Sequence, residues 1–209
     1  MKKNIIFILA ALLVVSCNTS VKSKVGENLI SDLSFNSCYN DVAESYEFDL
    51  DSLENFGSLI QNLDRITCEN QKPVIGFNIN NSRYRISPCH SCPDNRIIFC
   101  SKQRNELYIK KDSVRVDNFT AFPIDSLKQI LRKHILNEKN ESKYSESPKK
   151  AFVSISTNSN ESINTIKNIL LEIGEEFVEI KKDYKDSLYL SVQFKTNFAF
   201  DLSPPPSTK

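Results

Sequence analysis

The sequence predicts an α+β fold, in which a small sheet carries two amphipathic helices on one face and follows a cysteine-rich α+β segment. Alternating apolar and polar residues around 107–116 and 188–194 have the period of half-buried strands. Apolar residues that recur every three or four positions after Ser126 and Asn160 have the period of amphipathic helices. With 40% hydrophobic and 25% charged residues among 209, the composition is that of a globular protein.

The charge balance argues against nucleic acid as a partner. The 27 basic and 26 acidic side chains leave a formal net charge of +1, so the chain has no strong overall field. The chain has only four glycines, which makes a glycine-rich phosphate-binding loop improbable, and only two histidines, which leaves few candidates for a histidine-based site. We therefore expect no catalytic residue, no cofactor and no metal, and a protein that is not an enzyme.

The N-terminus has the order of an export signal. Lys2 and Lys3 precede the apolar run 5–15, which would span only about 16 Å as a helix, about half of the hydrocarbon core of a bilayer. The ending Val14-Val15-Ser16-Cys17 resembles the lipobox of bacterial lipoproteins. This resemblance implies a signal peptide over 1–16 and a palmitate-type lipid on Cys17; a secreted protein with an incidental Cys17 is the alternative. The polar residues 17–37 are expected to form a tether.

The remaining cysteines predict a disulfide-stapled segment over 38–104. They are Cys38, Cys68, Cys89, Cys92 and Cys100, and thiols tend to pair in an oxidising compartment. The Cys89-x-x-Cys92 spacing also allows a redox pair, or a zinc site completed by two further donors from the other cysteines or His90. The sequence does not determine which cysteines pair.

Weak element signals precede residue 105. The spacing Asp51-Ser52-Leu53-Glu54 is that of a capping box and predicts a helix over 52–64. Apolar residues in 74–79 and 83–86 predict two strands separated by an Asn-rich turn, and 97–99 predicts a third.

Clearer patterns follow. The alternation over 107–116 predicts a β-hairpin, and the stripe from Leu127 to Ile135 predicts a helix with His134 at its edge. The polar stretch 137–150 has no periodicity and is expected to be a solvated loop.

The last part predicts a β-α-β unit. A strand over 151–155 leads into a helix from Asn160, which Gly174 is expected to end, and a strand over 177–180 follows. A final strand over 188–194 precedes a proline-rich tail over 201–209.

This order of elements resembles the periplasmic domain of the ExbD/TolR family. The likeness covers about 105–182, within an expected domain over 105–200. It is carried by the following segments: Leu107-Tyr108-Ile109, Val114-Arg115-Val116, Ile124 to Leu131, Val153-Ser154-Ile155, Ile163 to Ile166 and Phe177 to Ile180. The family implies anchored subunits of proton-driven motors in biopolymer transport. The run 5–15 contains no carboxylate, so the proton-carrying role has no candidate here.

The two halves of the chain show a weak internal sequence similarity. Residues 48–53 and 122–127 share Asp-Ser-Leu, and an amphipathic helix and an apolar strand are expected after each, which indicates a degenerate repeat or chance identity.

Two functions follow from these features. The first is a non-catalytic, lipid-anchored cell-envelope protein, facing the periplasm or the cell exterior, that binds another envelope protein or itself. The second is a thiol-disulfide oxidoreductase that uses Cys89 and Cys92. A hydrolase is less favoured, because no Gly-x-Ser-x-Gly elbow occurs.

Overall fold

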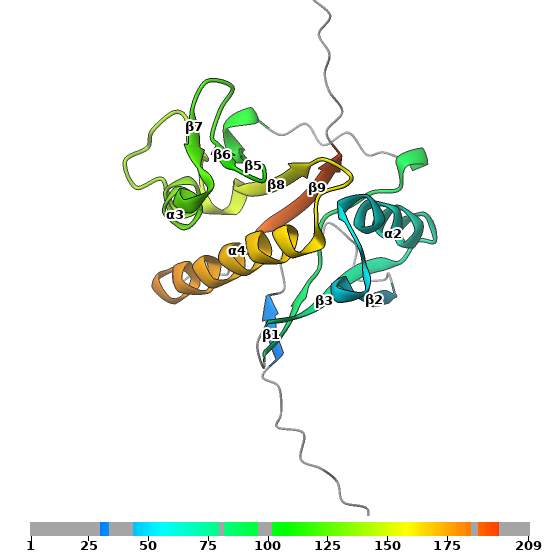
Figure 1. The fold of residues 1–209 in the computed structure, drawn as a ribbon. Coiled ribbons are helices and arrows are strands. Elements are labelled where there is room, and N and C mark those ends of the chain that lie inside the picture. The colour runs from blue at the N-terminus through cyan, green and yellow to red at the C-terminus, as the bar shows by residue number, and fades with distance from the viewer. Residues whose placement is uncertain (1–29, 34–43, 80–81, 96–101, 185–187, 197–209) are drawn as a thin grey trace, which may run out of the picture.

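The computed structural model describes residues 30–33, 44–79, 82–95, 102–184 and 188–196. In these ranges the fold is α+β, as predicted, with two mixed sheets and three helices (Figure 1). The predictions for 1–16 (signal peptide), 97–99 (strand) and 201–209 (tail) lie outside the described residues. None of the described helices is long and apolar enough to cross a membrane.

The first sheet has four strands in the order β1-β4-β3-β2. Their bounds are β1 Ile30–Leu33, β2 Ser45–Asp49, β3 Lys72–Ile79 and β4 Ser82–Ile86. The β3–β4 pair is antiparallel, as expected for two strands joined by a short turn, whereas β1–β4 and β2–β3 are parallel. Within the predicted tether over 17–37, residues 30–33 form strand β1, and the other residues lie outside the described part of the chain.

Helix α2, Phe56–Cys68, connects β2 to β3 and begins four residues later than predicted. The Asn55 side chain accepts the backbone N–H of Ser58, and the Ser58 hydroxyl accepts that of Asn55. This reciprocal cap starts the helix here, because it satisfies two N–H groups that the first turn leaves without partners. Residues of the predicted cap instead form η1, Leu50–Ser52, a short 3-10 turn held by the Asp49 carboxylate.

The second sheet has five strands in the order β7-β6-β5-β8-β9. Their bounds are β5 Glu106–Ile109, β6 Ser113–Arg115, β7 Ala121–Pro123, β8 Phe152–Thr157 and β9 Ser191–Thr196. The pair β5–β6 is the predicted hairpin, and β5, β8 and β9 run parallel.

Helices α3, Leu127–Leu136, and α4, Ile163–Asp183, cover one face of this sheet, as predicted. The steps from β5 to β8 and from β8 to β9 move in the same direction across the sheet, so two right-handed connections place both helices on the same side. Alternate residues of the parallel strands, such as Leu107, Val153 and Val192, are fully buried in a cluster with the apolar stripes of both helices.

Helix α4 contradicts two predictions. Gly174 does not end it, and 177–180 is helix, not strand. Phe177 and Ile180 continue the buried stripe of Ile166 and Ile173 at helical spacing, which outweighs the cost of a glycine within a helix, about 1 kcal/mol. The predicted parallel β-α-β unit therefore exists, but its second strand is β9.

The loop over 137–150 contains no helix or strand beyond the 3-10 turn η5, Pro148–Lys150. It is not simply solvated, however, because Tyr144 and Ser145 are buried. Asn105 accepts hydrogen bonds from the Ser145 hydroxyl and the backbone of Glu146. These contacts pack the loop against the start of β5.

The predicted boundary near residue 104 separates the two sheets along the chain, yet the hydrophobic cluster contains side chains from both. Backbone bonds also cross it: Phe56 donates to Glu161 and Gly57 donates to Ser159. Lys167 of α4 pairs with Asp51 of η1.

The first half reproduces the order strand, 3-10 turn, helix, strand seen in β7, η4 (Ile124–Ser126), α3 and β8, although β7 and β8 are not neighbours.

Candidate functional site

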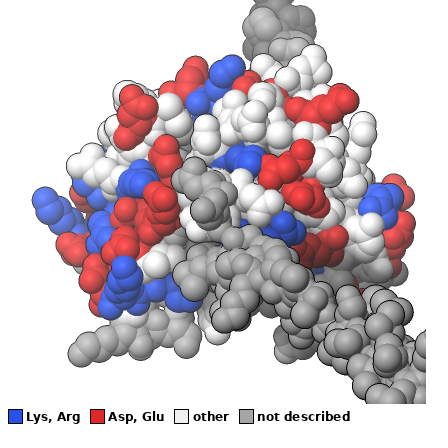
Figure 2. All heavy atoms as spheres, turned by 60° about the horizontal axis from the view of Figure 1, so that its bottom comes forward, with Lys and Arg blue, Asp and Glu red and all other residues white. Residues whose placement is uncertain are grey.

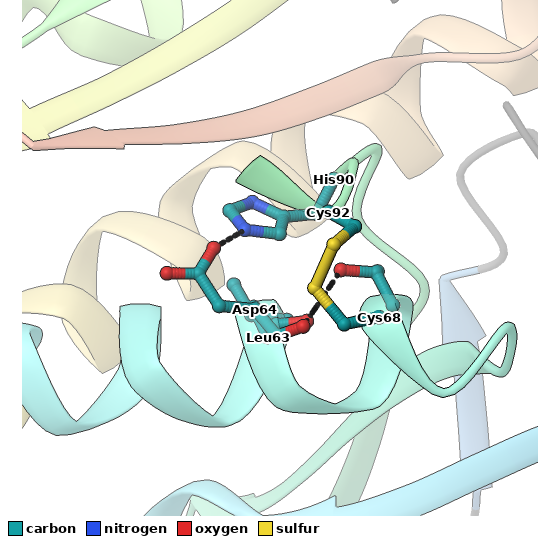
Figure 3. Close-up of a disulfide and its surroundings, with 6 residues drawn as sticks. Leu63, Asp64, Cys68, His90 and Cys92 are labelled. Atoms are coloured by element: carbon teal, nitrogen blue, oxygen red, sulfur yellow. Dashed lines mark hydrogen bonds and ion pairs between the residues drawn. A yellow bond between two sulfur atoms is a disulfide. The ribbon is translucent and has the colours of Figure 1, made fainter. Parts of the chain in front are cut away.

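A disulfide joins the end of α2 to the segment between β4 and η2, Pro93–Asn95 (Figure 3). Cys68 is the last residue of α2, and its bond to Cys92 closes a sequence separation of 24 residues. Thr67 fixes the preceding turn, since its hydroxyl donates to the carbonyl of Leu63 at 2.8 Å. The predicted disulfide-stapled segment thus contains at least one staple, Cys68–Cys92.

Cys89 connects the same segment to β9. It is buried and disulfide-bonded, its Sγ lies 2.8 Å from Ser191 Oγ, and its backbone N–H donates to the carbonyl of Val192 at 2.7 Å. Because β9 belongs to the second sheet, the cysteine-bearing segment is attached to both halves. Cys17, Cys38 and Cys100 lie outside the described residues.

This pairing bears on the redox and zinc alternatives. A dithiol oxidoreductase needs its two cysteines to form one disulfide, and here Cys92 is bonded to Cys68, not to Cys89. The ligand atoms of Cys68, Cys92 and Asp94 lie within 4.8 Å of one another, but zinc is bound by thiolates, which a disulfide does not provide. The geometry favours a structural staple.

The two histidines have different surroundings. His90 Nε2 lies 2.6 Å from Asp64 Oδ1, so this pair clips the segment to α2 beside the disulfide (Figure 3). His134 is fully buried within α3, and its Nε2 lies 3.0 Å from the carbonyl oxygen of Asn105. Burial lowers the pKa of His134 to about 4, so it is neutral near pH 7 and belongs to the core.

A polar cluster that the sequence did not reveal lies on the face of the second sheet opposite α3 and α4. The buried Glu106 carboxylate accepts hydrogen bonds from the Ser154 hydroxyl and the Lys195 ammonium. Burial, followed by the hydrogen bond to Glu106, raises the pKa of Tyr108. Lys195 balances the charge of the Glu106 carboxylate, so the two form a hydrogen-bonded ion pair. Ser154 has no exposed surface, so its hydroxyl is not accessible as a nucleophile.

The most exposed large apolar side chain of the described residues is Phe119, at the tip of the β6–β7 hairpin, with 95% of its surface exposed. One carboxylate oxygen of Asp117 accepts the backbone N–H groups of Phe119 at 2.8 Å and Thr120 at 2.6 Å. These bonds hold the pKa of Asp117 below its usual range. The carboxylate is therefore ionised at neutral pH and keeps accepting the hydrogen bonds that hold the turn. Arg115 and Gln103 donate to the backbone and side chain of Asn118.

A shallow hollow of about 300 Å³ lies beside this tip. It is lined by Gln103, Arg104, Val116, Asp117, Asn118, Phe119, Ser142 and Lys143. An exposed aromatic next to a polar hollow is an arrangement suited to contact with another macromolecule, because it combines an apolar anchor with hydrogen-bonding groups. The sequence offered one signal for this tip, the Asp117-Asn118 pair typical of a turn.

A second hollow, of about 370 Å³, lies along α4 and is lined mainly by charged residues such as Lys128, Glu175 and Glu176. Lys128 and Arg132 of α3 pair with these two carboxylates at 2.6 Å each. Figure 2 likewise shows basic and acidic side chains interleaved over the face that it displays. Neither the hollow nor this face carries charges of a single sign.

No protein-family model matches the sequence, and neither the curated proteins nor the solved structures contain a significant match.

Proposed function

We propose that this chain is a non-catalytic cell-envelope lipoprotein, anchored through a lipid on Cys17, whose folded part binds a protein partner. The anchor rests on the lipobox-like ending Val14-Val15-Ser16-Cys17. The Cys68–Cys92 disulfide is in keeping with export, because disulfides persist in oxidising compartments and are rare in the cytosol.

The observation that carries the binding function is the presentation of Phe119. Leaving a phenylalanine in water forfeits about 1.5–3 kcal/mol relative to burying it. Here the side chain is 95% exposed although Asp117 and its neighbours hold the turn in one conformation. An exposed aromatic on a held turn requires little ordering of the backbone on binding, and aromatic residues are typical of those that dominate interface energies.

The ExbD/TolR-like order of elements, whose last strand is β9 and not 177–180, would make the second sheet and its two helices the partner-binding unit. In that interpretation the protein is associated with biopolymer transport or energy transduction as a binding component, without a proton-carrying residue of its own.

The anchor is tested with Cys17→Ser in cells. We expect this variant to leave the membrane fraction, because acylation needs the thiol, whereas Ser16→Ala keeps the small residue before Cys17 and should remain bound. A Cys17→Ser variant that stays in the membranes after removal of its signal would overturn the anchor.

The binding surface is tested by crosslinking in cells with Phe119→Ser. We expect this variant to lose a crosslinked product that wild type forms. Tyr189→Ser, which changes another exposed aromatic with half its surface in water, should retain the product. Identical products from all three proteins would refute the assignment to Phe119.

A further inference from the structure

Strand β7 ends the second sheet on one side in the described part of the chain, and its bonding pattern shows which backbone groups point outward. Antiparallel partners alternate between residues that exchange both backbone bonds and residues that exchange none. In the β6–β7 register, Val116 N–H donates to Thr120 and Ile124 N–H donates to Asp112. The bonded positions of β7 and its flanks are therefore 120, 122 and 124.

Ala121 and Pro123 alternate with these positions, so their backbone groups face away from β6. Pro123 has no N–H, which leaves the N–H of Ala121 as the outward donor of this strand, with carbonyl acceptors at both residues. The next N–H toward the tip, that of Phe119, is already bonded to Asp117. The side chains of Ala121 and Pro123 are exposed.

We propose that two copies of this protein pair through β7, antiparallel and related by a two-fold axis at Ala121. In this register each Ala121 N–H donates to the Ala121 carbonyl of the second copy, so the pairing closes two backbone bonds and joins the five-stranded sheets. Phe119 and Pro123 lie two residues on either side of Ala121. The two-fold axis thus sets each Phe119 opposite Pro123 of the second copy, which removes the exposed ring from water.

Pro123 and the short length of β7 limit the pairing to a few backbone bonds. Both features protect sheet edges from extended pairing, because they remove donors along the strand. With one outward donor in each copy, the register centred on Ala121 satisfies both donors and also sets Phe119 opposite Pro123, and the pair closes on itself as two-fold interfaces do.

The surrounding charges permit identical surfaces to meet. The hollow beside Phe119 is lined by the acidic Asp117 and the basic Arg104 and Lys143. Two copies related by a two-fold axis then bring opposite charges into the same interface and do not depend on a single sign. This inference rests on the function proposed above, because a shared membrane anchor raises the local concentration at which a small interface forms.

The first test places the photo-crosslinking residue p-benzoylphenylalanine at position 119 of the full-length lipoprotein in cells. We expect a product of twice the monomer mass. A product with a different protein would overturn the pairing and leave the partner-binding function standing. The absence of any product would overturn both.

The second test uses the purified full chain in detergent and sedimentation velocity. Ala121→Pro removes the outward donor at a position that does not bond to β6, and should shift the protein to monomer, whereas Ala121→Val keeps the donor and should retain the dimer. Phe119→Ser provides an independent variant and should raise the dimer dissociation constant at least tenfold. Dimers of unchanged affinity in Phe119→Ser or in Ala121→Pro would refute the pairing.

Discussion

The Cys68–Cys92 disulfide should be a main source of stability, and its contribution can be calculated from the chain that it closes. The bond spans a sequence separation of 24 residues. In the chain-entropy model, closing a loop of this length removes about 3.5 kcal/mol of conformational entropy from the unfolded state. The double variant Cys68→Ala/Cys92→Ala should therefore lower the free energy of unfolding by about this amount, or Tm by roughly 7–14 °C for a chain of this size.

Chemical denaturation followed by circular dichroism, without reductant, measures this difference. The control repeats the comparison in reductant, where wild type also lacks the bond and the two curves should approach each other. A double variant that unfolds within about 1 kcal/mol of wild type in the absence of reductant would refute the reasoning.

Hydrogen exchange on the same variant tests the predicted boundary near residue 104. The sequence predicts that loss of disulfides loosens residues 38–100 and leaves β9 protected. The structure predicts a wider effect, because the segment that Cys92 holds also donates from Cys89 to Val192 of β9. Faster exchange at both the end of α2 and Val192 is expected; unchanged protection at Val192 would show that β9 is held independently of this segment.

Two further predictions concern the core. Ile166→Asp should unfold the protein, since it places an unpaired charge in a fully buried position, while Asn168→Asp on the exposed side of α4 should leave Tm unchanged; equal Tm values would contradict the placement of α4. His134 has a pKa of about 4 in the fold against an ordinary value of 6.5, so the unfolded chain binds the extra proton. Its contribution is present above pH 6.5 and falls by about 3 kcal/mol as the pH drops toward 4, and His134→Gln should flatten that part of the pH dependence of unfolding. Parallel pH profiles for the two proteins would contradict this.

Local periodicity predicts the hairpin, α3 and β8, because each buries one face and the spacing of apolar residues records that face. It fails at Phe177 and Ile180, which fit both a short apolar strand and a helical stripe. The choice is made by tertiary packing, because Phe177 and Ile180 are buried in the stripe of α4, and Lys128 and Arg132 of α3 also pair with Glu175 and Glu176. Such contacts join residues more than forty positions apart and leave no local pattern.

The candidate sites divide in the same way. Composition and the export signal predict disulfides, but the partner of Cys92 depends on how α2 packs against the later segment. Lys167, which looks like an exposed helix position in the sequence, proves to pair with Asp51 in the other half. The Glu106 cluster draws on three strands, and only their register brings Glu106, Ser154 and Lys195 together.

The binding tip also depends on distant residues, and this dependence supports its role. Gln103 donates to Asn118, and Arg104 donates to the carbonyls of Tyr144 and Glu141, so the tip and the loop over 137–150 are fixed through one short segment. That segment ends at Asn105, whose side chain is buried and bonded to Ser145. The turn that carries this exposed aromatic is therefore ordered before any partner arrives. Binding then requires little further ordering of the turn backbone. Most of the free energy gained by burying Phe119 therefore contributes to the affinity.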